Sequence, residues 1–343
     1  MKQRHRGPEA GGEGERRQET YLVGVWLAVL SAFGFSFKAI LIKLAYAVPQ
    51  ETPVDAVTLL ALRMLCALPV FLWCARSAGR GGKPFSRRDA LAIIGLGLVG
   101  YYGASIFDFV GLCYISAGLE RVILFTYPIL TLLFEVLWFR RPVSGYERLA
   151  VAVCYAGIAL VFVHDLGGAE HQRDIWLGSG FVLASAATYA FYLSGGGRLI
   201  ARYGSVRFAS AALIVSTLAT FVHFGVVHSP AALVQPVRVY LLALIMGLFS
   251  TVMPVFALAA AISRIGSAPA ALIGSLGPVL TIALGWGMLD EPLSLMQIFG
   301  ALLVIGAVLL IGRKGRQAAR KAIPAVVEEA EAAEAEPVGP VSG

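Results

Sequence analysis

Apolar residues run along this chain in long stretches, separated by short polar or charged segments. A run of about 20 apolar residues matches the hydrocarbon thickness of a bilayer when the chain is helical. Because lipid cannot hydrogen-bond exposed backbone groups, each run is predicted to form a transmembrane helix. The predicted spans cover residues 22–46, 54–75, 89–113, 118–139, 146–164, 176–197, 208–227, 239–262, 268–288 and 294–312. The pattern therefore predicts an all-α integral membrane protein with ten transmembrane helices.

The chain also contains a long internal repeat. After a shift of 150 residues, the segment around the fourth span aligns without a gap with the segment around the ninth. The shift places Pro128 on Pro278 and Thr131 on Thr281. A weaker match links the first spans of the two halves. Such a repeat in an apolar chain is typical of a duplicated helix bundle, which is a common architecture of transporters.

The repeat divides the chain into four parts. Residues 21–165 hold the first copy, with five predicted spans, and residues 175–312 hold the second copy, with five more. The tails, residues 1–20 and 313–343, are polar and are predicted to be disordered and cytoplasmic.

The composition excludes several classes of protein. Hydrophobic residues make up 58% of the chain and charged residues 14%, against about 25% charged residues in soluble proteins. The net charge of +7 does not indicate nucleic-acid binding, because the basic residues form short clusters between apolar runs. The 4 cysteines have neither metal-ligand spacing nor a disulfide pattern, so no metal and no cofactor are expected.

The distribution of basic residues predicts the orientation. Of the 28 Lys and Arg, 22 lie in the tails and the loops after spans 2, 4, 6 and 8, 3 lie in the opposite loops and 3 lie inside spans. Both termini are therefore predicted to be cytoplasmic, in the inner (plasma) membrane. Five spans per copy is an odd number, so the second copy must be inverted. Arg140 and Arg141 align with Asp290 and Glu291, and this exchange of charge fits the inversion.

Charges inside the predicted spans are costly and need a reason. Most lie in the first half, and two interpretations stay open. In the first, Lys38 and Arg63 bind an anionic group such as a substrate carboxylate. Asp108 or Glu120 then titrates or changes partner during gating. In the second, Asp108 and Glu120 form ion pairs with Arg63 and Arg121, which fix the hairpin of spans 3 and 4 to span 2.

Aromatic and proline residues complete the candidate site. Tyrosines combine a ring with a polar tip and suit an amphipathic substrate, although packing alone would also explain them. The candidates are Tyr101, Tyr102, Tyr127, Tyr189 and Tyr192. Pro128 and Pro278 lie in the middle of corresponding spans, where each removes a backbone hydrogen bond. They are predicted to be hinges that free carbonyls for the cavity, or packing kinks.

The motifs resemble a known family. Ten spans in two inverted halves, P-x-[LV]-T in spans 4 and 9, and a P-[LV]-S turn after each resemble the EamA branch of the drug/metabolite transporter superfamily. The resemblance covers residues 22–312 and implies export or exchange of small metabolites, often amino acids or related compounds, by alternating access. The family pattern usually has a Gly-Glu pair after span 4, where this chain has Arg140 and Arg141.

The sequence thus favours a secondary transporter of small organic metabolites, amino-acid-like or otherwise carboxylate-bearing, that works as an exporter. It has no phosphate-binding loop for ATP, so an ion gradient or exchange would drive it, with protons as a candidate coupling ion and a homodimer as a candidate assembly. The alternative is a membrane sensor or scaffold without transport activity. An enzyme is not expected, because no catalytic cluster is evident.

Overall fold

A computed structural model describes residues 9–51, 53–80, 84–139, 145–168, 171–265 and 267–310. Within these ranges the chain is helical and contains no strand. Eight helices of the described part are long and apolar enough to cross a membrane, and two shorter apolar helices follow, Gly277–Leu289 and Leu295–Leu310. The all-α membrane architecture is confirmed, while the exact number of ten spans stays a prediction.

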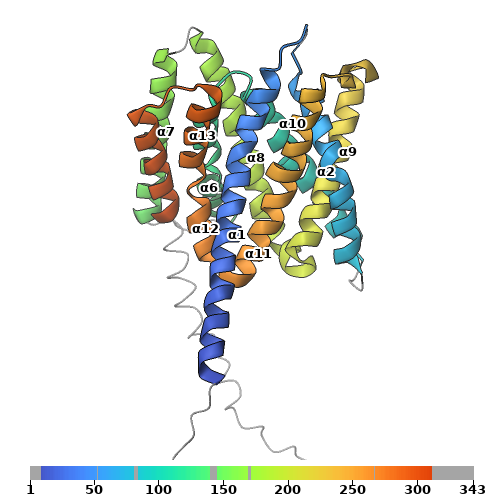
Figure 1. Cartoon of the computed structure of the whole chain (residues 1–343), viewed down its shortest axis with the longest axis vertical. Coiled ribbons are helices and arrows are strands. Elements are labelled where there is room, and N and C mark those ends of the chain that lie inside the picture. Colours follow the sequence, from blue (N-terminus) through green and yellow to red (C-terminus); the bar gives the residue numbers. More distant parts are fainter. Residues whose placement is uncertain are drawn as a thin grey trace, which may run out of the picture.

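The helices follow the predicted spans (Figure 1). The first copy contains α1 (Glu9–Tyr46), α2 (Ala56–Gly79), α3 (Arg87–Leu96), the π-helical segment η1 (Gly97–Gly103), α4 (Ala104–Gly111), α5 (Ala117–Leu124), α6 (Tyr127–Phe139) and α7 (Gly145–Gly168). The second contains α8 (Gln172–Tyr203), α9 (Ser205–Val227), the short 3₁₀ helix η2 (Pro230–Leu233), α10 (Val237–Gly247), the π-helical segment η3 (Leu248–Val252), α11 (Met253–Ile265), α12 (Ser267–Gly274), α13 (Gly277–Leu289) and the helix Leu295–Leu310.

The first helix is longer than the sequence predicted. Residues 1–20 were expected to be a disordered tail, but α1 begins at Glu9. Acidic residues at the start of this segment favour a helix, because negative charge is stabilising near a helix N-terminus. Residues 1–8 and the predicted tail 313–343 lie outside the described residues.

The two copies interlock. The first helix of each copy packs against the third and fourth spans of the other: α1 against α10, α11, α12 and α13, and α8 against η1, α4, α5 and α6. The second spans, α2 and α9, pack against each other. In Figure 1, α1 accordingly runs through the middle of the bundle, between α7 on one side and α9 on the other. The copies therefore form one bundle with a shared interior.

Two equivalent hydrogen bonds fasten this arrangement. Ser31 of α1 donates to the Pro254 carbonyl at 2.8 Å, and Ser185 of α8 donates to the Ala104 carbonyl at 2.7 Å. Both carbonyls belong to residues just beyond the π-helical segments, where the regular helical bonding pattern changes. Each serine thus provides a buried carbonyl of the opposite copy with a donor.

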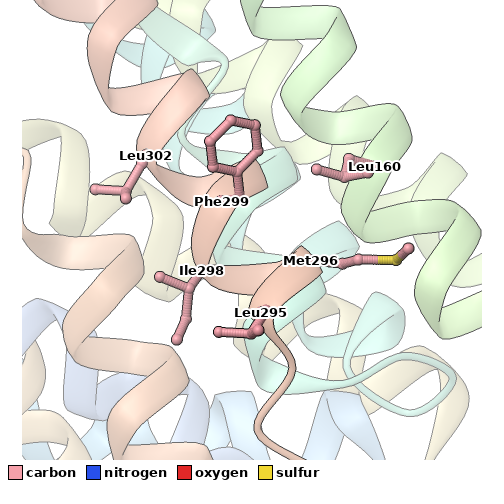
Figure 2. A pocket seen from close by; sticks show the side chains of 6 residues that line it. All are labelled: Leu160, Leu295, Met296, Ile298, Phe299 and Leu302. Atoms are coloured by element: carbon pink, nitrogen blue, oxygen red, sulfur yellow. The ribbon is translucent and has the colours of Figure 1, made fainter.

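The fifth spans of the copies cross at two glycines. A Cβ atom on Gly300 would lie 2.6 Å from the Gly157 carbonyl oxygen of α7, so the backbones are in direct contact. Beside this crossing is an open apolar hollow (Figure 2). All six residues that line it are apolar, and Leu295 is 84% exposed. Such a surface suits lipid rather than a polar solute.

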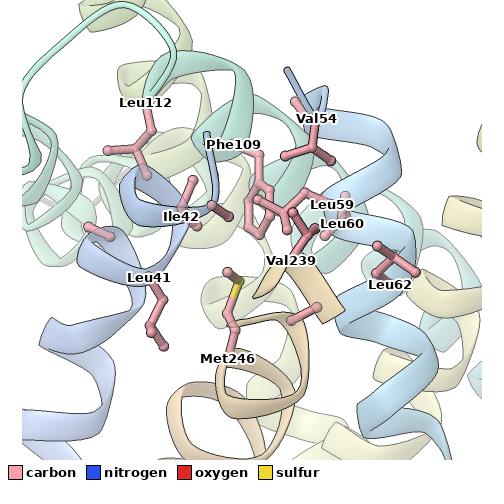
Figure 3. Packing of buried hydrophobic residues seen from close by; sticks show 14 of the residues in the cluster. Leu41, Ile42, Val54, Leu59, Leu60, Leu62, Phe109, Leu112, Val239 and Met246 are labelled. Atoms are coloured by element: carbon pink, nitrogen blue, oxygen red, sulfur yellow. The ribbon is translucent and has the colours of Figure 1, made fainter. Parts of the chain in front are cut away.

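The largest buried cluster holds the helices of the first copy in register with α10 (Figure 3). It combines Ile42 of α1, Leu59 of α2, Phe109 of α4 and Met246 of α10, all of them fully buried. Because α1, α2 and α4 also carry the charged residues of the candidate site, this packing fixes the position of those charges.

The glycine crossing gives a stability prediction. Gly300→Ala should lower the free energy of unfolding by about 1–3 kcal/mol, because the new methyl group meets backbone and Val161. Gly306→Ala on the same helix is the control, since nothing lies within 4 Å of the added Cβ. Thermal unfolding in detergent should show a lower midpoint for Gly300→Ala alone. Equal midpoints for the two variants would contradict the crossing.

Candidate functional site

Two pairs of helix irregularities lie at matching positions in the copies. The π-helical segments begin at Gly97 and Leu248, one residue out of register under the shift of 150. The fourth spans are interrupted at residues 125–126 and 275–276, in full register. At each interruption a backbone hydrogen bond spans three residues instead of the four of an α-helix. Thr126 N–H donates to the Ile123 carbonyl at 3.0 Å, and Leu276 N–H donates to the Ile273 carbonyl at 3.1 Å.

Pro128 and Pro278 lie just after these interruptions. Each occupies the start of the following helix, α6 or α13, where a missing N–H is tolerated. The prolines were predicted to be hinges or packing kinks, and the structure places both of them where a helix is broken. Interrupted helices at corresponding positions of two halves are the usual location of a binding site in transporters with inverted repeats.

A buried charge cluster joins α1, α4 and α5. Lys38 Nζ lies 2.6 Å from Asp108 Oδ2, and Asp108 is 1% exposed. Glu120 is fully buried, and its carboxyl group is a neighbour of that of Asp108. The predicted pairing of Asp108 with Arg63 or Arg121 is therefore replaced by a pair with Lys38. Sequence spacing could not indicate this, because the two partners are 70 residues apart.

Arg63 is held by other contacts. Its Nη2 donates to Ser105 Oγ at 3.1 Å, and its guanidinium lies 4.8 Å from the centre of the Phe109 ring. This cation–π contact and the hydrogen bond hold the charge among α2 and α4. Arg63 Nε is buried without a partner among the described residues.

Arg121 faces the interruption of the opposite copy. A Cβ on Gly277, the first residue of α13, would lie 3.1 Å from Arg121 Nη2, so the guanidinium packs closely against the backbone at this glycine. Arg121 forms no ion pair within the described part of the chain, and its Nε has no partner there. Its charge acts on Tyr127 and Tyr189, which are its neighbours. It is a cation at the junction of the two copies, and the described residues offer it no carboxylate within ion-pair distance.

Four tyrosines gather near this cation. The ring centroids of Tyr127 and Tyr189 are 5.1 Å apart, and those of Tyr189 and Tyr192 are 6.0 Å apart. Tyr101 joins them, 4.9 Å from Tyr192. Tyr102 does not belong to this group, since its hydroxyl group contacts His223 Nδ1 of α9 at 2.7 Å. Nothing in the sequence favours either of these neighbours over the other, and the π-helical turn in which they lie decides which of them faces the cluster.

Glu291 is a residue whose role the sequence did not reveal. Its carboxylate accepts hydrogen bonds from Ala117 N–H at 2.8 Å and Gly118 N–H at 3.4 Å, and so caps α5 of the other copy. Asp290, with φ of 55°, turns the chain back, and Gly285 leaves space for the Glu291 side chain. The only sequence signal was its alignment with Arg141, which lies outside the described residues.

Further side chains close the same end of α5. Ser116 caps the helix through Leu119 N–H and donates to Asp165 Oδ2 at 2.6 Å. Gln297, from the last helix, donates to Asp165 Oδ1 at 3.0 Å. The N-terminus of α5 is thus bound by three other segments of the chain, at the end of the bundle predicted to be outer. Within the described residues, no group of His, Cys, Asp and Glu side chains could hold a metal ion.

Inverted repeats, paired interruptions and polar side chains between the copies define a class of protein, the membrane transporters with internal symmetry. Residues 22–163 and 176–313 match the EamA-like transporter family, and the chain belongs to this family. The resemblance inferred from the motifs is thereby confirmed, and the protein is a multi-pass membrane transporter.

Relatives agree with this assignment. The chain is 31% identical over 286 residues to the uncharacterized transporter YcbK of Bacillus subtilis (strain 168), covering 81% of this chain and 88% of the relative. It is 25% identical over 320 residues to the uncharacterized transporter sll1319 of Synechocystis sp., covering 84% and 93%. A solved crystal structure with 18% identity matches 88% of this chain and 98% of its own with a TM-score of 0.58, which supports the fold.

The Lys38–Asp108 pair leads to a test by double-mutant cycle. Lys38→Met should lower stability by about 3–5 kcal/mol, because it leaves a buried carboxylate without its cation. Adding Asp108→Asn should restore part of the loss, since the remaining side chain carries no charge. Thermal unfolding of the three variants in detergent provides the measurement. Losses that simply add would show that the two residues do not interact.

Proposed function

We propose that this protein is a secondary transporter that exports small carboxylate-bearing metabolites, with amino-acid-like molecules as the favoured substrates. The observation that supports this proposal most directly is the position of Arg121, which faces Gly277 at the interrupted helix of the opposite copy. A cation that forms no ion pair with any described carboxylate, at such a junction, suits the anionic group of a substrate.

The substrate carboxylate would bind to Arg121, whose planar guanidinium can donate two parallel hydrogen bonds. Tyr127 and Tyr189 lie beside this position and offer rings and hydroxyl groups to the rest of the molecule. Lys38, which the sequence favoured for substrate binding, is neutralised by Asp108 and has a different task in this proposal. Arg63 supports the site from α2 through Ser105 and Phe109.

Alternating access would follow from the interlocked copies. The interruptions at residues 125–126 and 275–276 allow the two parts of each fourth span to change angle. The contacts of Glu291 with α5 would hold one end of the bundle closed and break when it opens. The charge pattern supports an orientation in the inner membrane with both termini cytoplasmic. We propose export from the cytoplasm as the direction of transport. We propose the proton as the coupling ion and leave a homodimer as a predicted assembly.

Counterflow in proteoliposomes tests the proposal. Vesicles that contain the purified protein and an unlabelled metabolite should accumulate the same labelled metabolite when it bears a carboxylate. Decarboxylated amines of the same size should give no accumulation. If no member of a broad panel of carboxylates exceeds empty vesicles, the transport function proposed here is wrong.

The role of Arg121 predicts a specific loss. Arg121→Gln should weaken apparent substrate affinity by at least about tenfold, because a charge-assisted hydrogen bond contributes roughly 1.5–3 kcal/mol. Arg121→Lys should keep part of the affinity, since it retains the charge and loses the fork geometry. Arg264→Gln is the control, because Arg264 is exposed and, among the described residues, donates to the Ala260 carbonyl of its own helix. Equal affinity in all variants would remove Arg121 from the site.

A further inference from the structure

The buried acids of the charge cluster have too few hydrogen-bond donors. Both carboxyl oxygens of Glu120 are buried without a donor among the described residues, and so is Asp108 Oδ1. Lys38 supplies one donor, to Asp108 Oδ2. Two neighbouring buried carboxyl groups therefore have one ammonium group beside them, and it is paired with Asp108.

Such a pair is strongly disfavoured when both members are ionised. A buried carboxylate accepts several hydrogen bonds in nearly all known structures, and two adjacent carboxylates repel each other. One proton removes both difficulties: a protonated Glu120 donates to Asp108 Oδ1, while Lys38 keeps its bond to Oδ2. The cluster then has a neutral acid, one carboxylate and one ammonium group, with no net charge.

The charged groups around Glu120 do not supply the missing donor. Arg63 approaches Asp108 from α2, but donates to Ser105. Arg121 follows Glu120 in α5 and faces Gly277. Among the helices packed against α5, α13 has no titratable side chain, α8 presents Tyr189 to Arg121, and α7 places Asp165 at Ser116. Glu291 binds the first N–H groups of α5.

We propose that the Glu120–Asp108 pair, held by Lys38, is the site that binds the coupling proton. The proposal rests on the transport function proposed above and assigns its ion to named residues. When the proton leaves, two carboxylates and one ammonium group remain, and the cluster has a net charge of −1. The ammonium group of an amino-acid-like substrate, with its carboxylate on neighbouring Arg121, can balance that charge. Proton and substrate then compete, and competition is what couples the export of one to the entry of the other.

Infrared spectroscopy tests the proton site without a substrate. Purified protein in lipid at neutral pH should show the carbonyl stretching band of a buried protonated carboxyl group, which disappears at alkaline pH. Glu120→Gln should lack this band. Glu51→Gln, which alters an exposed side chain, should keep it. A band that persists in Glu120→Gln, or its absence from the unmodified protein, would overturn the assignment.

A second variant keeps the proposal testable if Glu120→Gln does not fold. In Asp108→Asn the amide can donate to Glu120, and Lys38 is left with Glu120 as its only carboxylate, so Glu120 should ionise and the band should again be lost. If Glu120→Gln does not fold, as judged by gel filtration and thermal unfolding, Asp108→Asn alone decides, and retention of its band overturns the assignment.

Proton movement then separates this inference from the transport function. Proteoliposomes with a pH-sensitive dye inside are given an equimolar mixture of the standard L-amino acids. Substrate entry should release protons from the unmodified protein's vesicles, and the Glu120→Gln variant should exchange substrate without proton movement and without pH dependence. Net substrate entry without any proton movement in the unmodified protein would overturn the proton site while leaving transport intact. Absence of counterflow would instead contradict the transport function, and the infrared result would still decide the proton site.

Discussion

The bundle depends on reciprocal hydrogen bonds between its two copies. Ser31 and Ser185 occupy equivalent places in the first helices, and each donates to a carbonyl just beyond the π-helical segment of the other copy. No water is available in the hydrocarbon core, so an irregular helix is tolerated only when another part of the protein supplies the missing partner. The serines therefore stabilise the irregular segments by donating to their carbonyl groups. Those segments in turn give the bundle a polar interior.

The same shortage of donors distinguishes structural from functional polar groups. Glu291 and Asp165 have partners from the backbone or from neutral side chains, and they fasten one end of α5. Glu120 and Arg121, one turn further along that helix, lack such partners among the described residues. A polar group without a partner inside a membrane protein is energetically unfavourable. Its presence fits a partner, such as a substrate or a proton, that binds during transport. The N-terminal end of α5 is thus held by hydrogen bonds, while one turn further along the same helix Glu120 and Arg121 have atoms without a hydrogen-bond partner among the described residues.

Much of the fold could be predicted from the sequence, because spans and repeats depend on local hydrophobicity and on chain length. The helices lie where the apolar runs predicted them, and the proline positions marked both interruptions. The pairing of Lys38 with Asp108 and the choice of Tyr101 over Tyr102 could not be predicted in this way. The ion pair depends on how helices face each other across the bundle. The tyrosine depends on a π-helical turn, which changes the direction in which successive side chains point. The helical part of the predicted N-terminal tail was missed because its composition is polar.

The carboxylate cap on α5 makes the two copies energetically unequal. If the halves of a transporter were identical, its inward- and outward-facing states would be related by a two-fold rotation and would be equally populated at rest. Here Glu291 accepts from backbone N–H groups at one end, and the aligned position carries Arg141, which has no acceptor to offer. A difference of about 1.4 kcal/mol between the two closures already changes the ratio of the states tenfold. Under the alternating access proposed above, this difference would favour the state in which the Glu291 end is closed, and reopening that end would be the slow step of the cycle.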